Sequence, residues 1–467
     1  MPPTPTTTRP VPTPAAPSSA VLNRTLAVVI TGSVMAVLDM TIVNVALRSL
    51  TTAFAAPLET VQWATTGYTL ALAAVIPTAP WAIARIGAKR TYLTALAVFT
   101  LGSLLAAGAW DVGSLIAFRA VQGLGGGLLM PVGMTMVMRA ADRDHLGRAM
   151  AFSGLPIMIG PVLGPVLGGW LVDTADWRWI FLVNLPVGAL ALTLAARLLH
   201  PDAPVPAATA PRLDLPGLLT LSPGLALLLY GLTLGGERGD FTTPGALLPA
   251  LAGTLLIAAF VRHALTTRQP LLDLRLLRDR TFAASIGVLA LFAAGYFGSM
   301  LLGPVYWQQV RGFSPTTAGL LGAPVGLTVG LTMQLAARRI DRTSPRRLIP
   351  AGITLGALGM ALTALQIGDP TTPAWRLVAS AMLMGIGAGT VLMPTMTTAT
   401  RALPTDRLAA AGTALSINSQ LWSAVGTALI STLLTTATFP TAYTAATLLL
   451  ALALLPALRL PGRRPHP

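Results

Sequence analysis

Two ionisable side chains lie inside apolar stretches of the chain and provide the first candidate chemistry. Asp39 falls in the apolar run 26–47, and Arg119 falls in the run 114–137. Burial disfavours a charged carboxylate, whereas a nearby cation favours it. We therefore expect Asp39 either to carry a proton or to pair with Arg119 or with a cationic substrate, which would couple proton and substrate movement. A buried structural pair that only orients helices is the alternative.

Other chemistry is sparse. The chain has no cysteine, which excludes disulfides, thiolate metal sites and a cysteine nucleophile, and its four histidines fall outside the apolar runs. The GLGGG stretch that begins at Gly123 lacks the last glycine of a nucleotide-binding fingerprint, because Leu128 occupies that position, and no Walker lysine follows. We expect no metal, no cofactor other than the proton as coupling ion, no ATP-driven pump and no enzyme.

The composition indicates that these residues are positioned by membrane-spanning helices. Hydrophobic residues make up 54% of the 467 residues, and charged residues only 10%, whereas soluble domains carry about 25% charged residues. A spanning helix needs about 20 mostly apolar residues. The sequence predicts an all-α membrane protein with about fourteen spans, near 26–47, 61–83, 91–110, 114–137, 149–171, 179–198, 215–234, 244–261, 281–303, 315–336, 348–366, 377–398, 409–433 and 441–458.

The loop charges predict the orientation. With an even number of spans, both termini lie on one side, and 25 of the 31 Lys and Arg fall on that side or in its loops. This asymmetry predicts a bacterial inner-membrane protein with both termini in the cytoplasm. It also explains the net charge of +15 without a nucleic-acid partner. The Pro- and Thr-rich residues 1–24 lack the pattern of a signal peptide and are expected to form a disordered tail.

A weak internal repeat predicts the domain organisation. GLGGGLLMP in the fourth span resembles GIGAGTVLMP in the twelfth span. If these spans are equivalent, two pseudo-symmetric six-helix bundles flank an inserted helix pair. The expected division is a tail at 1–24, an N-terminal bundle at 25–200, a linker and inserted pair at 201–269, a C-terminal bundle at 270–460 and a tail at 461–467.

Two spans carry glycines at every fourth residue, which allows close approach between helices. In the fifth span these are Gly160, Gly164 and Gly168. The tenth span has the same spacing at 322, 326 and 330. We predict that the two glycine faces pack together at the interface between the bundles. Glycines that face lipid because of compositional bias are the alternative.

Several motifs in combination resemble the major facilitator superfamily, and within it the fourteen-span drug:proton antiporters. They include LDMTIVNVAL at 38–47, FRAVQGLGGGLLMPVGM at 118–134, GPVLGPVLGGWL at 160–171 and DWRWIFLVNLPVG at 176–188. The resemblance extends from about residue 26 to residue 458. It implies proton-driven export, with Asp39 and Arg119 in the family's first-span and fourth-span charged positions. It also implies that the antiporter signature consists of Gly160, Pro161, Gly164, Pro165, Gly168 and Gly169.

The loop after the second span departs from the family pattern. Gly87, Lys89 and Arg90 match it, but Pro80 and Ala84 occupy the usual Gly and Asp positions. The missing carboxylate puts in doubt the contact that this loop usually makes between the two halves. Another contact would have to stabilise the outward-facing state, or that state would be less favoured.

Aromatic and amide side chains within the spans are candidates for an amphipathic substrate cavity, although core packing explains each of them equally well. These candidates are Asn44, Trp63, Tyr68, Gln122, Phe292, Tyr296, Gln334, Asn418, Gln420 and Trp422. The sequence therefore favours a monomeric, proton-coupled exporter of hydrophobic or amphipathic small molecules such as drugs, antibiotics or secondary metabolites. A proton symporter that imports a small solute, and a membrane receptor or enzyme, are the alternatives.

Overall fold

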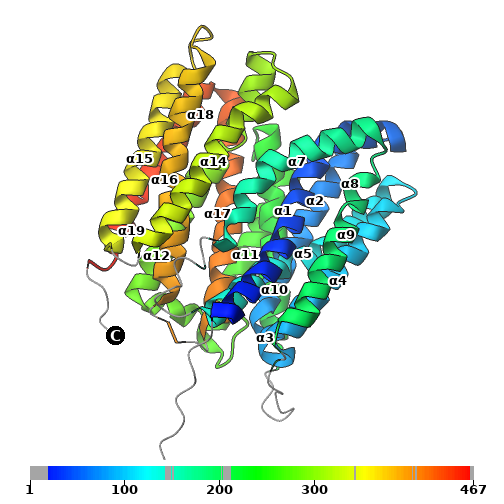
Figure 1. The fold of residues 1–467 in the computed structure, drawn as a ribbon, viewed down its shortest axis with the longest axis vertical. Coiled ribbons are helices and arrows are strands. Elements are labelled where there is room, and N and C mark those ends of the chain that lie inside the picture. Colours follow the sequence, from blue (N-terminus) through cyan, green and yellow to red (C-terminus); the bar gives the residue numbers. More distant parts are fainter. Residues whose placement is uncertain are drawn as a thin grey trace, which may run out of the picture.

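The computed structural model describes residues 19–141, 149, 152–200, 202, 212–340, 343–401, 403–404 and 407–462. Within these ranges the chain is helical and contains no strand. Long helices run side by side in one elongated bundle (Figure 1). The predicted all-α membrane fold is thus confirmed, whereas most of both predicted tails, 1–18 and 463–467, lies outside the described residues.

The helices follow the apolar runs, and several extend beyond the predicted ends into flanking polar residues. In chain order they are α1 (Ser19–Phe54), α2 (Leu58–Val75), η1 (Ile76–Thr78), α3 (Ala79–Ile86), α4 (Ala88–Ala107), α5 (Val112–Ala140), α7 (Leu155–Thr174), α8 (Trp179–Leu182), α9 (Asn184–Leu198), α10 (Leu215–Arg238), α11 (Pro244–Thr266), η2 (Leu274–Arg278), α12 (Arg280–Phe292), η3 (Ala293–Phe297), α13 (Leu302–Val305), η4 (Tyr306–Val310), α14 (Pro315–Ile340), α15 (Pro345–Gln366), α16 (Ala374–Arg401), α17 (Leu408–Thr436), α18 (Phe439–Leu452) and α19 (Leu454–Ala457).

Twelve segments among the described residues are long and apolar enough to cross a membrane. The chain is therefore a multi-pass membrane protein. The predicted spans 149–171 and 409–433 correspond to α7 and α17, which have 20 and 29 residues and are not among these twelve. The number fourteen and the arrangement of an inserted pair between two bundles stay predictions.

The two glycine-rich stretches of the internal repeat serve the same purpose in α5 and α16. A Cβ atom at Gly125 would meet the α4 backbone, and one at Gly127 would meet the α2 backbone. In the same way, Gly387 lies against α15 and Gly389 lies against α14. Each stretch thus lets one helix pack closely against two neighbours, which explains why small residues recur there.

The hairpin of α10 and α11 packs against α2 and α17 through α10. Asp214 connects the beginning of α10 to the end of α11. The Asp214 carboxylate accepts hydrogen bonds from the N–H of Gly217 at 3.0 Å and of Leu271 at 2.9 Å, and its Oδ1 lies 2.7 Å from Nε2 of His263. One carboxylate therefore caps α10, binds the last turn of α11 and holds the segment that leads to α12.

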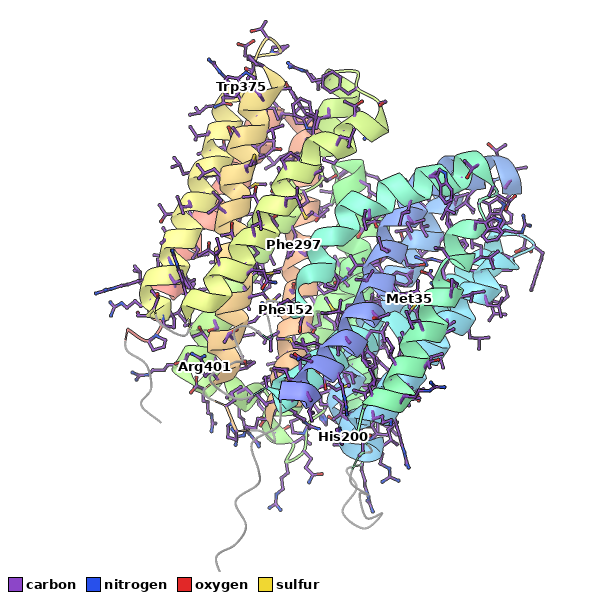
Figure 2. All side chains as sticks on the ribbon, viewed as in Figure 1. Met35, Phe152, His200, Phe297, Trp375 and Arg401 are labelled. Atoms are coloured by element: carbon purple, nitrogen blue, oxygen red, sulfur yellow. The ribbon has the colours of Figure 1, made fainter. Side chains whose placement is uncertain are left out.

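The helices on either side of the hairpin share a hydrophobic core near one end of the bundle. Buried side chains from both sides form a single cluster there, including Met136 and Met138 of α5, Met333 of α14, Met393 of α16 and Leu408 of α17. This is the end where His200 and Arg401 lie, whereas Trp375 marks the opposite end (Figure 2).

At the opposite end the buried residues form separate clusters. One cluster contains Leu50, Trp177 and Phe181 from the N-terminal helices, and the other contains Tyr306 and Tyr443 from the C-terminal helices. In Figure 1, α7 and α14 also diverge toward this end. The two groups of helices are thus packed together mainly at the end where α5 and α16 terminate.

The predicted span 281–303 lies within one long apolar segment, Arg280–Val310, whose helix geometry changes along its length. The helix changes from α12 into the π-helical η3, and further short turns, α13 and η4, continue to Val310. Close approach of α17 accompanies the change: a Cβ atom at Gly298 would lie 2.7 Å from the backbone carbon of Gly426. The sequence pattern does not reveal this change of geometry, because hydropathy alone does not distinguish π from α turns.

Candidate functional site

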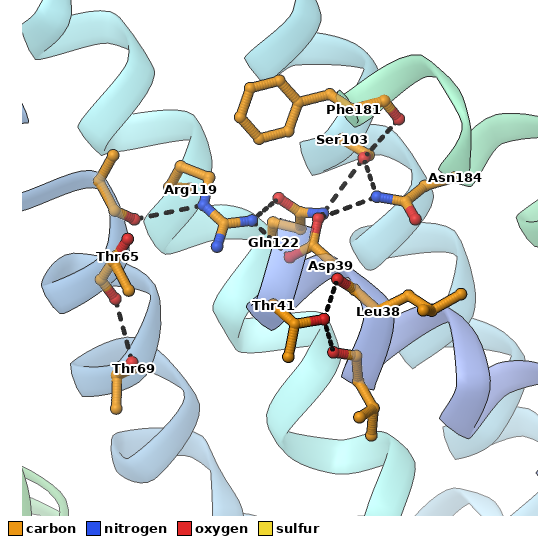
Figure 3. Close-up of polar contacts among 12 residues, drawn as sticks. Leu38, Asp39, Thr41, Thr65, Thr69, Ser103, Arg119, Gln122, Phe181 and Asn184 are labelled. Atoms are coloured by element: carbon orange, nitrogen blue, oxygen red, sulfur yellow. Dashed lines mark hydrogen bonds and ion pairs between the residues drawn. The ribbon is translucent and has the colours of Figure 1, made fainter. Parts of the chain in front are cut away.

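Asp39 and Arg119 meet in the interior of the N-terminal helices. Asp39 is on α1 and Arg119 is on α5, and both side chains are fully buried. Nη1 of Arg119 lies 2.5 Å from Oδ2 of Asp39, as Figure 3 shows. The predicted pairing of the two lone charges is therefore present, between residues that are 80 positions apart.

Two neutral amide donors, one from α5 and one from α9, complete the carboxylate site. Nε2 of Gln122 donates to Oδ1 of Asp39 at 2.8 Å, and Nδ2 of Asn184, the first residue of α9, donates to the same oxygen at 2.9 Å. Oγ of Ser103, on α4, accepts from both amides and donates to the backbone carbonyl of Phe181 at 3.0 Å. Four helices thus contribute to one buried network (Figure 3).

The Arg119 guanidinium is held on its other sides by α2. Its Nε donates to the carbonyl of Ala64 at 3.2 Å, and its Cζ lies 4.2 Å from the centre of the Tyr68 ring. Its Nη1 also donates to Oε1 of Gln122 at 2.6 Å. Nη2 has no hydrogen-bond partner among the described residues, so this arginine retains unused donor capacity in the interior.

This arrangement stabilises a charged carboxylate in apolar surroundings. Removing one partner of a buried ion pair typically costs about 3–5 kcal/mol, because the remaining charge loses its compensation. Each charge of the pair is therefore compensated only while the other is present.

The glycine face of α7 packs on α1, directly beside the charged site. A Cβ atom at any of the three glycines Gly160, Gly164 and Gly168 would contact side chains of α1, namely those of Val37, Thr41 and Ile42. Oγ1 of Thr41 also donates to the carbonyl of Gly160 at 3.2 Å. The glycines therefore fix α7 against the helix that carries Asp39, two residues before Thr41.

The predicted packing of this glycine face against the glycines of α14 fails at Gly322. The helices α7 and α14 do contact each other, but the face with Gly164 is directed at α1, and nothing lies within 4 Å of a Cβ atom at Gly322. The period of four identified a close helix contact but not its partner, because the spacing carries no information about the opposite surface. Gly169 has open space around it, and the side chains of Pro161 and Pro165 lie outside the described residues.

The loop residues Gly87, Lys89 and Arg90 are connected to the segment after α9. The Asp202 carboxylate accepts hydrogen bonds from the N–H of Ala88 at 2.9 Å and of Arg90 at 3.3 Å, at the first turn of α4. Nζ of Lys89 donates to backbone carbonyls near the end of α9 at 2.6 and 2.8 Å. Gly87 has a φ of +91°, which favours glycine. These contacts lie within the N-terminal helices.

The expected effect of Ala84 concerns the contact between halves. Helix α3, which contains Ala84, packs against α17 of the other half. At the start of α17, the side chain of Arg407 forms no hydrogen bond that caps the helix. Within the described residues, the hydrophobic core shared by α5, α14, α16 and α17 joins the halves at this end instead. Ala84 itself is exposed and does not belong to this core.

The candidate cavity residues of the first half lie in different surroundings. Gln122 and Tyr68 belong to the charged network described above. Trp63 is 39% exposed and its ring lies 5.3 Å from that of Tyr230 on α10. Asn44 is on α1, but its side chain lies outside the described residues.

The candidates of the second half are also dispersed. The rings of Phe292 and Tyr296 stack at 5.2 Å, at the junction of α12 and η3. Nδ2 of Asn418 donates to the carbonyl of Ile286 at 3.3 Å, and Nε2 of Gln334 is buried without a partner among the described residues. Gln420 faces α2 and α10, and Trp422 is 37% exposed. A common cavity stays a prediction.

Sequence reasoning missed three polar residues that hold the site. Asn184 and Ser103 carry no charge, and amides and hydroxyls within spans are common enough that neither stood out. Asp202 lies in a polar stretch that looked like an ordinary linker. A search for amide side chains in the predicted spans could have found Asn184, which lies in the DWRWIFLVNLPVG stretch.

Comparison with known proteins identifies the class of this chain. The model of the Major Facilitator Superfamily matches residues 29–427 and 288–467, so the chain belongs to this superfamily of transporters. The fold agrees: the human organic anion transporter MFSD10 (TETRAN) has a TM-score of 0.66 at 15% identity and covers 93% of this chain and 99% of that one. The proton:xylose symporter XylE has a TM-score of 0.65 at 17% identity over 94% and 95% of the two chains.

Relatives with higher sequence identity carry the names of multidrug resistance proteins. The Multidrug resistance protein B homolog of Mycobacterium tuberculosis is 43% identical over 415 residues, which are 89% of this chain and 76% of the relative. The Putative multidrug resistance protein MdtD of Escherichia coli is 34% identical over 409 residues, 86% of this chain and 84% of the relative. The chain is accordingly a membrane transporter, and neither its family nor its fold is that of an enzyme.

Proposed function

We propose that this transporter is a proton-coupled antiporter that exports hydrophobic or amphipathic small molecules, such as drugs, antibiotics or secondary metabolites, across the bacterial inner membrane. The observation that carries the proposal is the fully buried ion pair of Asp39 and Arg119, surrounded by neutral amide donors from α5 and α9. A charge pair at this depth is costly to maintain, and such pairs mark ion and substrate pathways in membrane proteins.

Coupling follows from competition for one carboxylate. In the observed state Asp39 accepts from Arg119, Gln122 and Asn184. When a proton binds Asp39, the carboxylate becomes neutral and Arg119 loses its counter-charge. Binding of a proton and of a cationic substrate that interacts with the Asp39 carboxylate would then be mutually unfavourable, as an exchange of the two across the membrane requires.

The distribution of the core supports alternating access. The two groups of helices share one cluster of buried hydrophobic residues at the end where α5 and α16 terminate. At the other end their buried residues form separate clusters. With the termini in the cytoplasm, as the loop charges favour, this is an outward-facing arrangement. Rocking of two six-helix bundles would close the outer end and open the inner one.

The proposal includes fourteen spans and a monomer. Helix α7 has 20 residues and α17 has 29, enough to cross about 30 Å of hydrocarbon at 1.5 Å per residue. Both pack between other long helices, α7 on α1 and α14, and α17 on α10 and α5. Small and polar residues lower the mean hydropathy of α17, whereas α7 is strongly apolar.

The names of the relatives support export of drugs, whereas no feature of the described residues selects one compound. Transport into everted membrane vesicles tests the proposal, with a fluorescent cationic dye as the probe and an imposed proton gradient as the driving force. We expect dye accumulation that collapses with the gradient, and loss of at least nine-tenths of it in Asp39→Asn and in Arg119→Ala.

The matched control is Asp176→Asn, because Asp176 is half-exposed and paired only with Arg178. It should transport like the wild type. Full gradient-driven accumulation in Asp39→Asn at wild-type expression would refute the coupling role of Asp39, and accumulation that ignores the gradient would refute proton antiport.

A further inference from the structure

A pocket of about 780 Å³ lies at the end of the bundle that bears the chain termini. It is enclosed by the beginning of α12, the beginning of α15 and the segment at and after α19, which lie close together in Figure 1. Its lining residues are Leu277, Arg280, Ala283, Ala284, Gly287, Arg346, Pro456, Leu458, Arg459 and Leu460. None of them belongs to the charged site of Asp39.

Three cations line the pocket without a negative partner. Arg280, Arg346 and Arg459 are all exposed, and none of their side chains forms an ion pair or hydrogen bond within the described residues. The adjacent carboxylate, Asp279, accepts from the N–H of Phe282 at 2.7 Å as the cap of α12. Three free guanidinium groups around one pocket provide donors that suit a phosphate group.

The rest of the pocket is apolar and extends along one face of α12. Positions 280, 283, 284 and 287 share this face, and the seven-residue separation corresponds to about 10 Å along the helix. Small side chains leave the space open, and Gly287 lies against the ring of Pro456. Leu277 and Leu458 at the rim are 46% and 53% exposed, so a charged region adjoins one that favours hydrocarbon.

We propose that this pocket binds an anionic phospholipid, with the headgroup phosphate among Arg280, Arg346 and Arg459 and an acyl chain along Leu277 and Leu458. The combination of free arginines with exposed leucines at the end of membrane-spanning helices favours a lipid over a free anion. Basic pockets between helices on the cytoplasmic side are suited to such headgroups. The pocket volume is within the range of small-molecule sites, about 300–1,000 Å³.

Native mass spectrometry of the purified transporter with added phosphatidylglycerol or phosphatidylcholine tests the site. We expect the wild type to retain phosphatidylglycerol at least ten-fold better than the triple variant Arg280→Gln, Arg346→Gln, Arg459→Gln, and to show little preference for phosphatidylcholine. The matched control removes three other exposed arginines from the same end, Arg197, Arg262 and Arg268, and should stay within two-fold of the wild type. Equal losses in both triple variants, or none in either, would overturn the proposal.

A second variant distinguishes a lipid from free phosphate. Ala283→Leu keeps all three arginines but fills the apolar face, so it should weaken phosphatidylglycerol retention several-fold. Millimolar inorganic phosphate should not displace the lipid from the wild type. Displacement by inorganic phosphate, together with unchanged lipid binding in Ala283→Leu, would show that the pocket binds the phosphate group alone and would overturn a lipid site.

Discussion

Asn184 donates a hydrogen bond of 2.9 Å to Asp39 across 145 positions of sequence. The two residues come from the beginning of α9 and the middle of α1, and Ser103 of α4 fixes the amide by accepting from the same nitrogen at 2.9 Å. The carboxylate that we propose to exchange protons is therefore positioned by uncharged residues as well as by Arg119.

Replacing Asn184 by Ala should weaken the network that holds the Asp39 side chain. The variant removes one donor to the carboxylate, and hydrogen bonds to charged groups contribute about 1.5–3 kcal/mol. We expect gradient-driven transport to fall several-fold. The measurement is dye efflux in proteoliposomes. Asn184→Asp should worsen transport further by placing a second acid beside Asp39, and wild-type efflux in both variants would contradict a positioning role.

Enlarging Gly164 should separate α7 from α1. A Cβ atom there would overlap Thr41, and overpacking typically costs about 1–3 kcal/mol. We expect Gly164→Val to lower the melting temperature of the purified protein and to abolish most transport. Gly169→Ala is the control, because nothing lies within 4 Å of the added methyl group, and it should behave like the wild type. Equal melting temperatures for both variants would mean that the close contact is unimportant.

Removing the Asp202 carboxylate should loosen the start of α4. Asp202 accepts from the N–H groups of Ala88 and Arg90, and loss of such a cap costs about 0.5–2 kcal/mol. We expect Asp202→Ala to lower thermal stability and to expose the loop at Lys89 to trypsin. Asp176→Ala, which removes a half-exposed carboxylate, should leave both properties unchanged. Wild-type protease resistance in Asp202→Ala would contradict this account.

Asp214 should make stability depend on pH in the acidic range. Burial raises the pKa of Asp214, but hydrogen bonds from Gly217, His263 and Leu271 outweigh it and hold the pKa below its usual value. A carboxyl with a lowered folded-state pKa stabilises the protein above its unfolded pKa of about 3.9 and loses that contribution as the pH falls through the folded value. Asp214→Ala should therefore melt below the wild type at pH 6.

The difference between the wild type and Asp214→Ala should narrow when melting is measured at progressively lower pH, down to about pH 3. Asp176→Ala serves as the comparison, because Asp176 is half-exposed and its ion pair is with Arg178. A melting-temperature difference for Asp214→Ala that is constant over the whole pH range would show that the charge on Asp214 does not stabilise the hairpin.

The sequence by itself determined the class of fold and the two central charges. Long apolar runs must form helices in lipid because every backbone polar group has to be satisfied internally, so the long helices could be placed from hydropathy. Asp39 and Arg119 stood out because a lone charge in such a run needs compensation. The 2.5 Å contact between them confirms that each of these buried charges is compensated by the other.

Only the tertiary structure decided which surfaces meet. The glycine period in α7 predicted a close neighbour, but side-chain spacing on one helix does not encode the partner, and the neighbour is α1 beside Thr41. The roles of Asn184, Ser103 and Asp202 likewise depend on contacts between residues 81 to 145 positions apart. Neutral polar side chains cost too little in isolation to be noticed in a sequence, and their importance arises only when the fold places them against a buried charge or a helix end.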